Sequence, residues 1–377
     1  MTERRWQAAR MALGTATAIG LGRFAYGLLL PAMSDDLRWT YAAAGTITTA
    51  NGLGYLVGAM STAPLARRFG TAFTFRAGMV VCAVSLAATA VGDAYEGLLL
   101  ARVVAGIGGA LVFITGAVIA PGAVYFAGTG LGILLCGATL PFLLDLHPDR
   151  WPVAWIGMAL VAGAAVALSW TAAGPDQRVR VAGSTGSLRP LVWLAVTYLL
   201  FAIGYIAYIT FLSAYLVDRG ATPLQTAVTW SLLGAAVMAA PGLWSRPIRR
   251  WPGRRVLATL LAGVGGSSAL ALLSSSPAVV LVSALAYGAT FMAVPAAVTS
   301  LVRSVTSPEA LTGALAALTV VFAAGQTVGP WLSGVMADLV GPAGALAWTA
   351  VLCGAASLLA GTAVGAGTPS RPALGRC

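Results

Sequence analysis

The sequence holds little charge and no lysine at all. Charged residues make up 9% of its 377 residues, and the 22 basic residues are all arginine. Acidic residues number only 11. Hydrophobic residues make up 59% of the chain, which is more apolar surface than a soluble protein of this length buries. We therefore predict an integral membrane protein, whose solvent is the lipid bilayer.

Residues that carry enzymatic or metal chemistry are also scarce. His147 is the one histidine, and the four cysteines show no spacing typical of disulfides or metal sites. No serine lies in a nucleophile motif, and glycine-rich runs such as GIGG (106–109) lie inside apolar segments without a preceding strand or a Walker lysine. We expect no metal, no cofactor and no ATP hydrolysis. An intramembrane enzyme is therefore a disfavoured alternative.

Twelve apolar segments are long enough to cross a bilayer, which takes about 20 residues. They predict an all-α integral membrane fold, and the short gaps between them carry turn residues. The segments are 11–33, 42–65, 73–92, 96–119, 122–144, 152–173, 190–216, 224–244, 256–274, 278–302, 312–337 and 343–365.

The arginines sort to one side of these segments. With the N-terminus in the cytoplasm, most of them fall in cytoplasmic loops, and only Arg38, Arg150 and Arg219 lie on the other side. This positive-inside bias predicts a bacterial cytoplasmic membrane protein with both termini in the cytoplasm. It also accounts for the net charge of +11 without a nucleic-acid partner. Arg23 and Arg102 are the two arginines that remain within helices.

The longest polar stretch, residues 172–190, separates six segments from six. We predict an N-terminal six-helix bundle over 1–173, a cytoplasmic linker over 174–189, a C-terminal six-helix bundle over 190–366 and a cytoplasmic tail over 367–377. The halves repeat, because a shift of 182 residues places Gly106 on Gly288, whereas a shift of 197 places Gly128 on Gly325. The change of shift predicts that the connection between helices 4 and 5 is about 15 residues shorter than its counterpart.

Three motifs resemble the major facilitator superfamily. LLLARVVAGIGGA (98–110) is similar to its helix-4 motif, with Arg102 and Gly106 at the matching places. LARRFG (65–70) is similar to the helix 2–3 motif Leu-Ala-Asp-Arg-x-Gly and keeps Arg68 and Gly70, but Arg67 stands where that motif has aspartate. GQTVGPWLSG (325–334) resembles the Gly-Pro motif of exporters. Its matching residues are Gly325, Gly329 and Pro330.

GRFAYGLLLP (22–31) and TANGLGYLVGA (49–59) narrow the resemblance to the bacterial YbfB/YjiJ-like subfamily. The resemblance implies two pseudo-symmetric six-helix bundles and a secondary transporter that moves a small organic solute by alternating access. It leaves the substrate open, including whether it is an anion. We expect the partners to be that solute and the lipid bilayer, and the protein to be a monomer.

In such a transporter the solute site lies near the middle of the membrane, between the halves. Arg23 on helix 1 and Arg102 on helix 4 are our first candidates, because a charged residue inside a membrane helix faces a wet cavity or a partner. A guanidinium suits a carboxylate or phosphate. The alternatives are a backbone-bonded, structural Arg23, and a role for Arg102 in coupling or packing.

Uncharged residues complete the predicted site. Tyr26 follows Arg23 by three residues, on the same helix face. Tyr205 and Tyr208 lie on helix 7 in a series that includes Tyr198 and Tyr215, which predicts one stripe of phenols. Packing within the bundle, with Tyr198 and Tyr215 at the membrane interfaces, is the alternative for the series. Asn51 and Gln326 are weaker candidates, since a lone polar residue in a membrane helix often bonds to another helix.

Coupling and direction stay open at this stage. No acidic residue lies deep in a predicted helix, so uniport, exchange and coupling through substrate protonation are all compatible with the sequence. The Gly-Pro motif favours efflux by analogy only. A transporter-like sensor or a decayed transporter is the alternative function, suggested by the missing loop aspartate and the short helix 4–5 connection.

Overall fold

The computed structural model describes residues 2–120, 122–175, 191–274 and 276–362, and within them the chain is helical apart from short turns. Most of the predicted linker and the whole predicted tail lie outside these residues. The N-terminal half contains α1 (Thr2–Thr15), the π-helix η1 (Ala16–Phe24), α2 (Tyr26–Asp36), α3 (Tyr41–Phe69), α4 (Thr71–Thr89), α5 (Tyr95–Ile119), α6 (Ala123–Leu146), the 3-10 turn η2 (Pro148–Arg150) and α7 (Trp151–Ser169). The C-terminal half contains α8 (Val192–Asp218), α9 (Pro223–Arg250), α10 (Gly253–Leu273), α11 (Pro277–Phe291), α12 (Val294–Val305), α13 (Pro308–Val340) and α14 (Pro342–Thr362).

These elements make twelve long helices, because α1, η1 and α2 follow one another as the first, and α11 and α12 together form the tenth. Among the described residues, 11 helical segments are long and apolar enough to cross a membrane. The second helix, α3, does not reach that hydropathy. Its buried face carries Gly45, Thr48, Asn51 and Gly52 in place of large apolar residues, and this face packs on α5 and α13.

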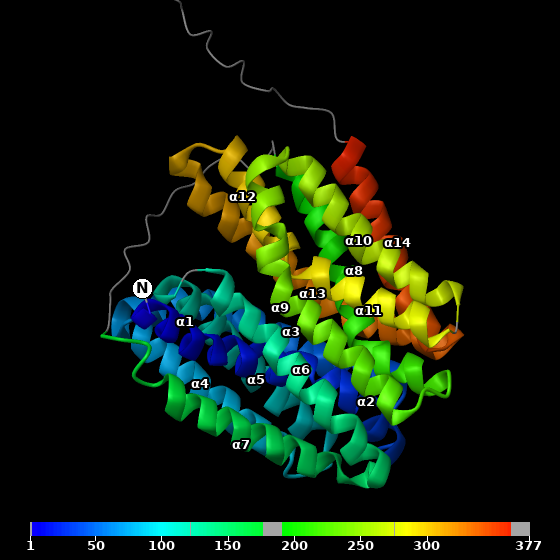
Figure 1. Cartoon of the computed structure of the whole chain (residues 1–377). Coiled ribbons are helices and arrows are strands. Elements are labelled where there is room, and N and C mark those ends of the chain that lie inside the picture. The colour runs from blue at the N-terminus through cyan, green and yellow to red at the C-terminus, as the bar shows by residue number, and fades with distance from the viewer. Residues whose placement is uncertain (1, 121, 176–190, 275, 363–377) are drawn as a thin grey trace, which may run out of the picture.

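The helices form two bundles that lean against each other (Figure 1). The main contacts between them are α2 with α8, α3 with α13, and α6 with α9. Glycines allow the backbones to approach: a Cβ on Gly45 of α3 would collide with the carbonyl oxygen of Pro330 in α13. The two halves are therefore in close contact through three helix pairs.

The two ends of the bundle differ in charge. At one end α3 and α9 finish and α4 and α10 begin, with Arg67, Arg68, Arg249, Arg250 and Arg254; we call it the arginine-rich end. The opposite end carries Asp36, Asp93, Asp218 and Asp338, and we call it the acidic end. Figure 1 shows the two halves diverging toward the end where the N-terminus lies, which is the arginine-rich end.

The connection between helices 4 and 5 is tight, but the prediction about its counterpart is wrong. The chain turns between Ile119 and Ala123 in the first half and between Val305 and Pro308 in the second, so both turns are short. The extra residues of the second half are helical instead. The helix α13 has 33 residues, whereas α6 has 24. The shift in the repeat therefore reports a longer helix, which hydropathy alone does not distinguish from a loop with apolar residues.

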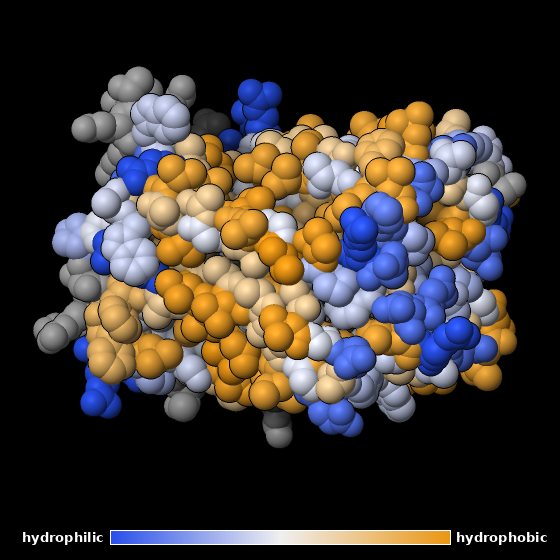
Figure 2. All heavy atoms as spheres, turned by 90° about the horizontal axis from the view of Figure 1, so that it is seen from below, coloured by the Kyte–Doolittle hydropathy of each residue, from blue (hydrophilic) through white to orange (hydrophobic). Residues whose placement is uncertain are grey.

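The outer face of the N-terminal half is largely apolar. Figure 2 shows hydrophobic side chains over the middle of this face, with hydrophilic residues gathered toward its ends. Exposed side chains here include Val80 and Val84 of α4, and Ile156 and Leu160 of α7. Such a band suits contact with lipid acyl chains, as the composition predicts.

Candidate functional site

A cavity of about 250 Å³ lies between the halves. It is lined from the N-terminal half by η1, α3 and α5, and from the C-terminal half by α8, α12 and α13. The lining positions on α5, α8, α12 and α13 lie in the parts of these helices nearer the arginine-rich end. The lining residues are Ile19, Arg23, Phe24, Tyr55, Phe113, Ile114, Tyr198, Tyr205, Met292, Pro295, Val298, Thr299, Leu315, Leu318, Thr319, Phe322 and Gln326.

Two irregular helices border this cavity. The first helix changes from α to π geometry over Ala16–Phe24, and Arg23 lies in the last turn of that π segment. Single π turns inside α-helices are frequent at functional sites. The tenth helix breaks between Phe291 and Val294, just before Pro295. A proline lacks the N–H that a continuous helix would need and clashes with the preceding turn. The sequence therefore sets an irregular backbone on both sides of the cavity.

Within the part of the chain that the structure describes, Arg23 is the one charged residue of the lining. It is 7% exposed, and its Nη2 donates to Oε1 of Gln326 at 2.9 Å, across the two halves. The guanidinium lies over the ring of Tyr55, 5.4 Å from its centroid. A cation–π contact of this kind stabilises a charge that has lost much of its water. The predicted cavity position of Arg23 therefore agrees with the geometry.

Gln326 and Tyr205 meet at the same point. The hydroxyl of Tyr205 donates to Gln326 Oε1 at 3.3 Å, so this amide oxygen accepts from two side chains. Two buried donors beside it, Nε of Arg23 and Nε2 of Gln326, have no hydrogen-bond partner. Buried donors without partners are costly, at about 1–3 kcal/mol each. The site is therefore rich in donors and short of acceptors.

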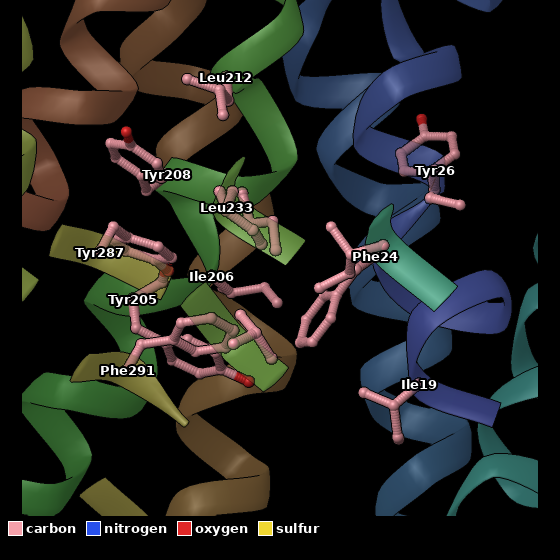
Figure 3. Packing of buried hydrophobic residues seen from close by; sticks show 14 of the residues in the cluster. Ile19, Phe24, Tyr26, Tyr205, Ile206, Tyr208, Leu212, Leu233, Tyr287 and Phe291 are labelled. Atoms are coloured by element: carbon pink, nitrogen blue, oxygen red, sulfur yellow. The ribbon is translucent and has the colours of Figure 1, made fainter. Parts of the chain in front are cut away.

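Aromatic rings form the wall of the cavity on the C-terminal half. Tyr198 stacks on Phe322 with centroids 4.9 Å apart and planes 20° apart. The ring centroids of Tyr205 and Phe322 are 5.8 Å apart, with planes 19° apart. Phe201 stacks on Tyr205 with centroids 4.8 Å apart. Figure 3 shows Tyr205 and Phe291 facing Phe24 and Ile19 of the first helix. The wall is therefore a set of nearly parallel rings.

The predicted stripe of four phenols is in fact two faces. Residues seven apart share a helix face, whereas a step of three turns it by about 60°. Tyr198 and Tyr205 face the cavity, whereas Tyr208 bonds with Ser283 Oγ at 2.8 Å and Tyr215 donates to the Ala271 carbonyl at 2.6 Å. Tyr198 is 7% exposed and lines the cavity, so it is not an anchor at the membrane interface.

Arg102 lies inside the N-terminal bundle, away from the cavity lining. Its Nη1 donates to the Gly22 carbonyl at 3.0 Å, and its guanidinium is 4.7 Å from the centroid of the Trp155 ring. Its Nε and Nη2 have no hydrogen-bond partner. The carbonyl that it holds belongs to the residue before Arg23. Contact between Arg102 and the solute stays a prediction, but the geometry favours support of the π segment.

Tyr26 and Asn51 are also engaged within the N-terminal half. The hydroxyl of Tyr26 donates to the Ala44 carbonyl at 2.9 Å. Nδ2 of Asn51 donates to the Arg102 carbonyl at 3.2 Å. Neither lines the cavity, so their roles as solute ligands stay predictions as well. Of the seven predicted ligands, the structure brings together Arg23, Tyr205 and Gln326.

Most of the motif residues end a helix or allow two helices to lie close together. Gly70 ends α3 with φ at 96°, a conformation that favours glycine. Gly106 lies against α3 at Asn51 and Tyr55, and Gly325 and Gly329 lie against α8. The carbonyl of Pro330 accepts from Ser333 Oγ at 3.0 Å. Arg67 and Arg68 are exposed in the last turn of α3, with Arg68 over the Phe69 ring at 5.2 Å.

At the acidic end the two halves are joined. Both carboxylate oxygens of Asp338, near the end of α13, accept from α3: from the backbone N–H of Tyr41 at 2.7 Å and of Ala42 at 2.9 Å. The Tyr41 ring meets Phe211 of α8 edge-on at 6.1 Å. A Cβ on Gly27 of α2 would collide with the carbonyl oxygen of Ile209. The halves are therefore closed here, while the cavity extends toward the arginine-rich end.

Sequence reasoning missed Phe322 and the contact of Asp338. Phe322 lies one helical turn before Gln326, which is a spacing that places both on one face. The pairing of Asp338 with the start of α3 has no signal in the sequence, because it depends on how the halves dock. In the part of the chain that the structure describes, no group of three or more His, Cys, Asp or Glu side chains is placed to hold a metal ion.

Comparison with known proteins gives a family and a fold. A family model described as "Uncharacterised MFS-type transporter YbfB" matches residues 15–365. An aspartate-to-alanine mutant of the nucleoside transporter NupG is similar with a TM-score of 0.73 at 12% identity, over 94% of this chain and 98% of that chain. A structure of NupG itself gives 0.67 at 12% identity, over 94% and 97%. The human organic anion transporter MFSD10 (TETRAN) gives 0.61 at 14% identity, over 95% and 99%. No curated protein sequence matches. At such identities the likeness to these structures shows the fold alone.

Proposed function

This chain belongs to the YbfB family of MFS-type transporters, and we propose that it carries a small organic anion across the bacterial cytoplasmic membrane. It is a secondary transporter rather than an enzyme. The proposed anion site is the cavity beside Arg23, with Tyr205 and Gln326 as further ligands. Because the two halves of one chain build this cavity, we propose that a monomer is the working unit.

The unsatisfied donors at Arg23 are the observation that carries this proposal. Nη2 of Arg23 already binds an amide oxygen, whereas Nε on the same guanidinium and Nε2 of Gln326 lack acceptors. A carboxylate offers two oxygens in the plane that a guanidinium fork prefers. It would take the place of the Gln326 oxygen on Arg23 and free the amide to turn its own N–H toward the solute. A neutral solute with one acceptor would leave a buried donor unpaired.

We propose that the arginine-rich end faces the cytoplasm. The arginine bias between the loops supports this orientation. The cavity then faces the cytoplasm, and the acidic end, closed by Asp338 and Tyr41, faces the opposite side. In alternating access the halves rock about the solute, closing the cytoplasmic side as the acidic end opens. The Arg23–Gln326 bond crosses the halves, so binding at this point acts on both.

We propose that the solute itself couples transport to the movement of protons or of a second anion. Among the described residues, the cavity lining contains no aspartate, glutamate or histidine that would carry a proton across the membrane. We therefore propose that a weak acid crosses either with its own proton or in exchange for another anion. The direction then follows the gradients of the solute and of protons.

Cellular metabolite levels test the proposed anion site. An untargeted comparison of cells with and without the protein should reveal a set of carboxylates whose levels differ. Arg23→Gln should abolish those differences, because it removes the charge that offsets the carboxylate. Arg150→Gln is the matched control, since it removes an exposed arginine at the acidic end, away from the cavity and outside the motifs. A folded, membrane-inserted Arg23→Gln protein with unchanged metabolite differences would refute the anion site.

A further inference from the structure

We propose that the anion is an aromatic monocarboxylate, with its carboxylate on Arg23 and its ring against the aromatic wall of α8 and α13. This inference rests on the proposed anion site and goes further by naming the class of solute. It is argued from the charge, the rings and the size of the cavity.

The charge of the cavity fits one carboxylate. Among the described residues, Arg23 is its single charged lining residue, and the other buried arginine of that half, Arg102, is held between Gly22 and Trp155. A second carboxylate would enter a place without a counter-charge, which a low-dielectric site strongly disfavours. A dianion is therefore a poor ligand, whereas a monoanion leaves the occupied site neutral.

The rings of the cavity fit a flat, unsaturated body. Six of the lining residues are aromatic, and they come from both halves. They are Phe24, Tyr55, Phe113, Tyr198, Tyr205 and Phe322. Aromatic rings pack with one another in offset or edge-on arrangements that contribute more than the buried area alone. A solute ring would join a set of rings that already lie within 20° of parallel around Phe322.

The size and the remaining polarity point to the same class. A cavity of about 250 Å³ lies just below the range of about 300–1,000 Å³ that holds drug-sized ligands. The polar lining residues are Arg23, Gln326, Thr299, Thr319 and the tyrosines Tyr55, Tyr198 and Tyr205. A sugar or a peptide would need many more hydrogen bonds than these side chains offer. A compact apolar ring with one carboxylate suits them well.

Binding of matched acids to the full-length protein in lipid nanodiscs tests the inference. The probes are trans-cinnamate, 3-cyclohexylpropanoate with the same number of carbons but a saturated ring and chain, cinnamamide without the charge, and 4-carboxycinnamate with a second charge. We expect cinnamate to bind about three- to tenfold more tightly than the saturated acid, because of the added ring–ring contact. Cinnamamide and the dianion should each bind at least tenfold more weakly than cinnamate.

Variants assign the two parts of the site. Phe322→Leu should remove the preference for cinnamate over the saturated acid while keeping the preference for acid over amide. Tyr205→Phe keeps the ring but removes a hydroxyl donor from the anion site, so it should keep the preference for cinnamate over the saturated acid while both acids bind more weakly. Phe142→Leu, which changes a phenylalanine that is 43% exposed on α6, is the matched control. Thermal unfolding of each variant in nanodiscs shows whether it is folded.

The outcomes separate the inference from the proposed function. Equal affinity for cinnamate and the saturated acid, with both lost in Arg23→Gln, would overturn the aromatic class and leave the anion site standing. Binding of cinnamamide as tight as cinnamate, together with no effect of Arg23→Gln, would overturn both. A preference for cinnamate that survives Phe322→Leu would show that the ring does not meet the proposed wall.

Discussion

Replacing Asp338 with asparagine should open the acidic end of the protein. The Asp338 carboxylate spans the halves by accepting from two backbone N–H groups at the start of α3. These are among the first N–H groups of a helix, which have no partner within it and carry the positive end of the helix dipole. Asparagine has one acceptor oxygen and no charge. It therefore loses one of the two bonds and the attraction to the dipole.

The size of the effect follows from the exposure of the carboxylate. Asp338 is exposed, so the charge–dipole part is about 0.3–1 kcal/mol. The lost hydrogen bond adds about 0.5–1.5 kcal/mol. A total of about 1–2 kcal/mol changes the ratio of open to closed acidic ends by about 5- to 30-fold. Such a change is within reach of distance measurements on a population.

Spin labels at the acidic end measure that ratio. Cysteines at Asp93, in the loop after α4, and at Leu273, the last residue of α10, place one label on each half in a chain whose native cysteines are replaced. Asp338→Asn should increase the ratio of long to short distances by the stated factor. Asp36→Asn is the matched control, because Asp36 accepts from Trp151 Nε1 at 2.8 Å within one half. An unchanged distribution in Asp338→Asn, or an equal change in Asp36→Asn, would refute the reasoning.

Two further substitutions test the packing between and within the halves. Gly27→Ala adds a Cβ that collides with the Ile209 carbonyl across the halves, so the same labels should report a larger open share. Gly157→Ala is the control, because no atom lies within 4 Å of the added Cβ, and it should leave the open share unchanged. Equal open shares in the two variants would count against the docking of α2 on α8. Arg102→Met removes the hydrogen bond that holds the Gly22 carbonyl of the π segment and the contact with the Trp155 ring, so thermal stability should fall. Cinnamate affinity should change less than threefold in Arg102→Met, whereas a loss of tenfold or more would restore Arg102 as a solute ligand.

The sequence predicts the fold well because the bilayer imposes a strong length rule. Twelve helices and the family follow from apolar runs and three motifs, and among the described residues 11 helical segments are long and apolar enough to cross a membrane. The resemblance to the YbfB-like subfamily is confirmed by the family match over residues 15–365. The second helix was predicted from its length although its hydropathy is low, because its buried face is polar. The length of α13 was not predicted, since a shift in the repeat does not say whether the added residues form a helix or a loop.

The lining of the cavity was predicted in part, for a physical reason. A buried charge is conspicuous in an apolar sequence, so Arg23 was readily found. Phe322 and Tyr198 were not, because an aromatic residue in a membrane helix gives the same signal whether it faces lipid, another helix or a cavity. Their facing depends on the rotation of α8 and α13 within the bundle. The contacts of Arg102 likewise depend on the π segment that brings the Gly22 carbonyl to it.

The repeat explains why the two halves contribute unequally to the cavity. Gly128 and Gly325 correspond in the repeat, yet α6 begins five residues before the first and α13 begins 17 residues before the second. At 1.5 Å per residue, α13 extends about 18 Å further toward the arginine-rich end. Five lining residues, Leu315, Leu318, Thr319, Phe322 and Gln326, lie on α13, and none lies on α6. The extension itself therefore supplies Leu315, Leu318 and Thr319, whereas Phe322 and Gln326 correspond in the repeat to Tyr125 and Thr129 of α6. The charge of the cavity comes from one half and its rings come from both, which suits the proposed solute with one carboxylate and one ring.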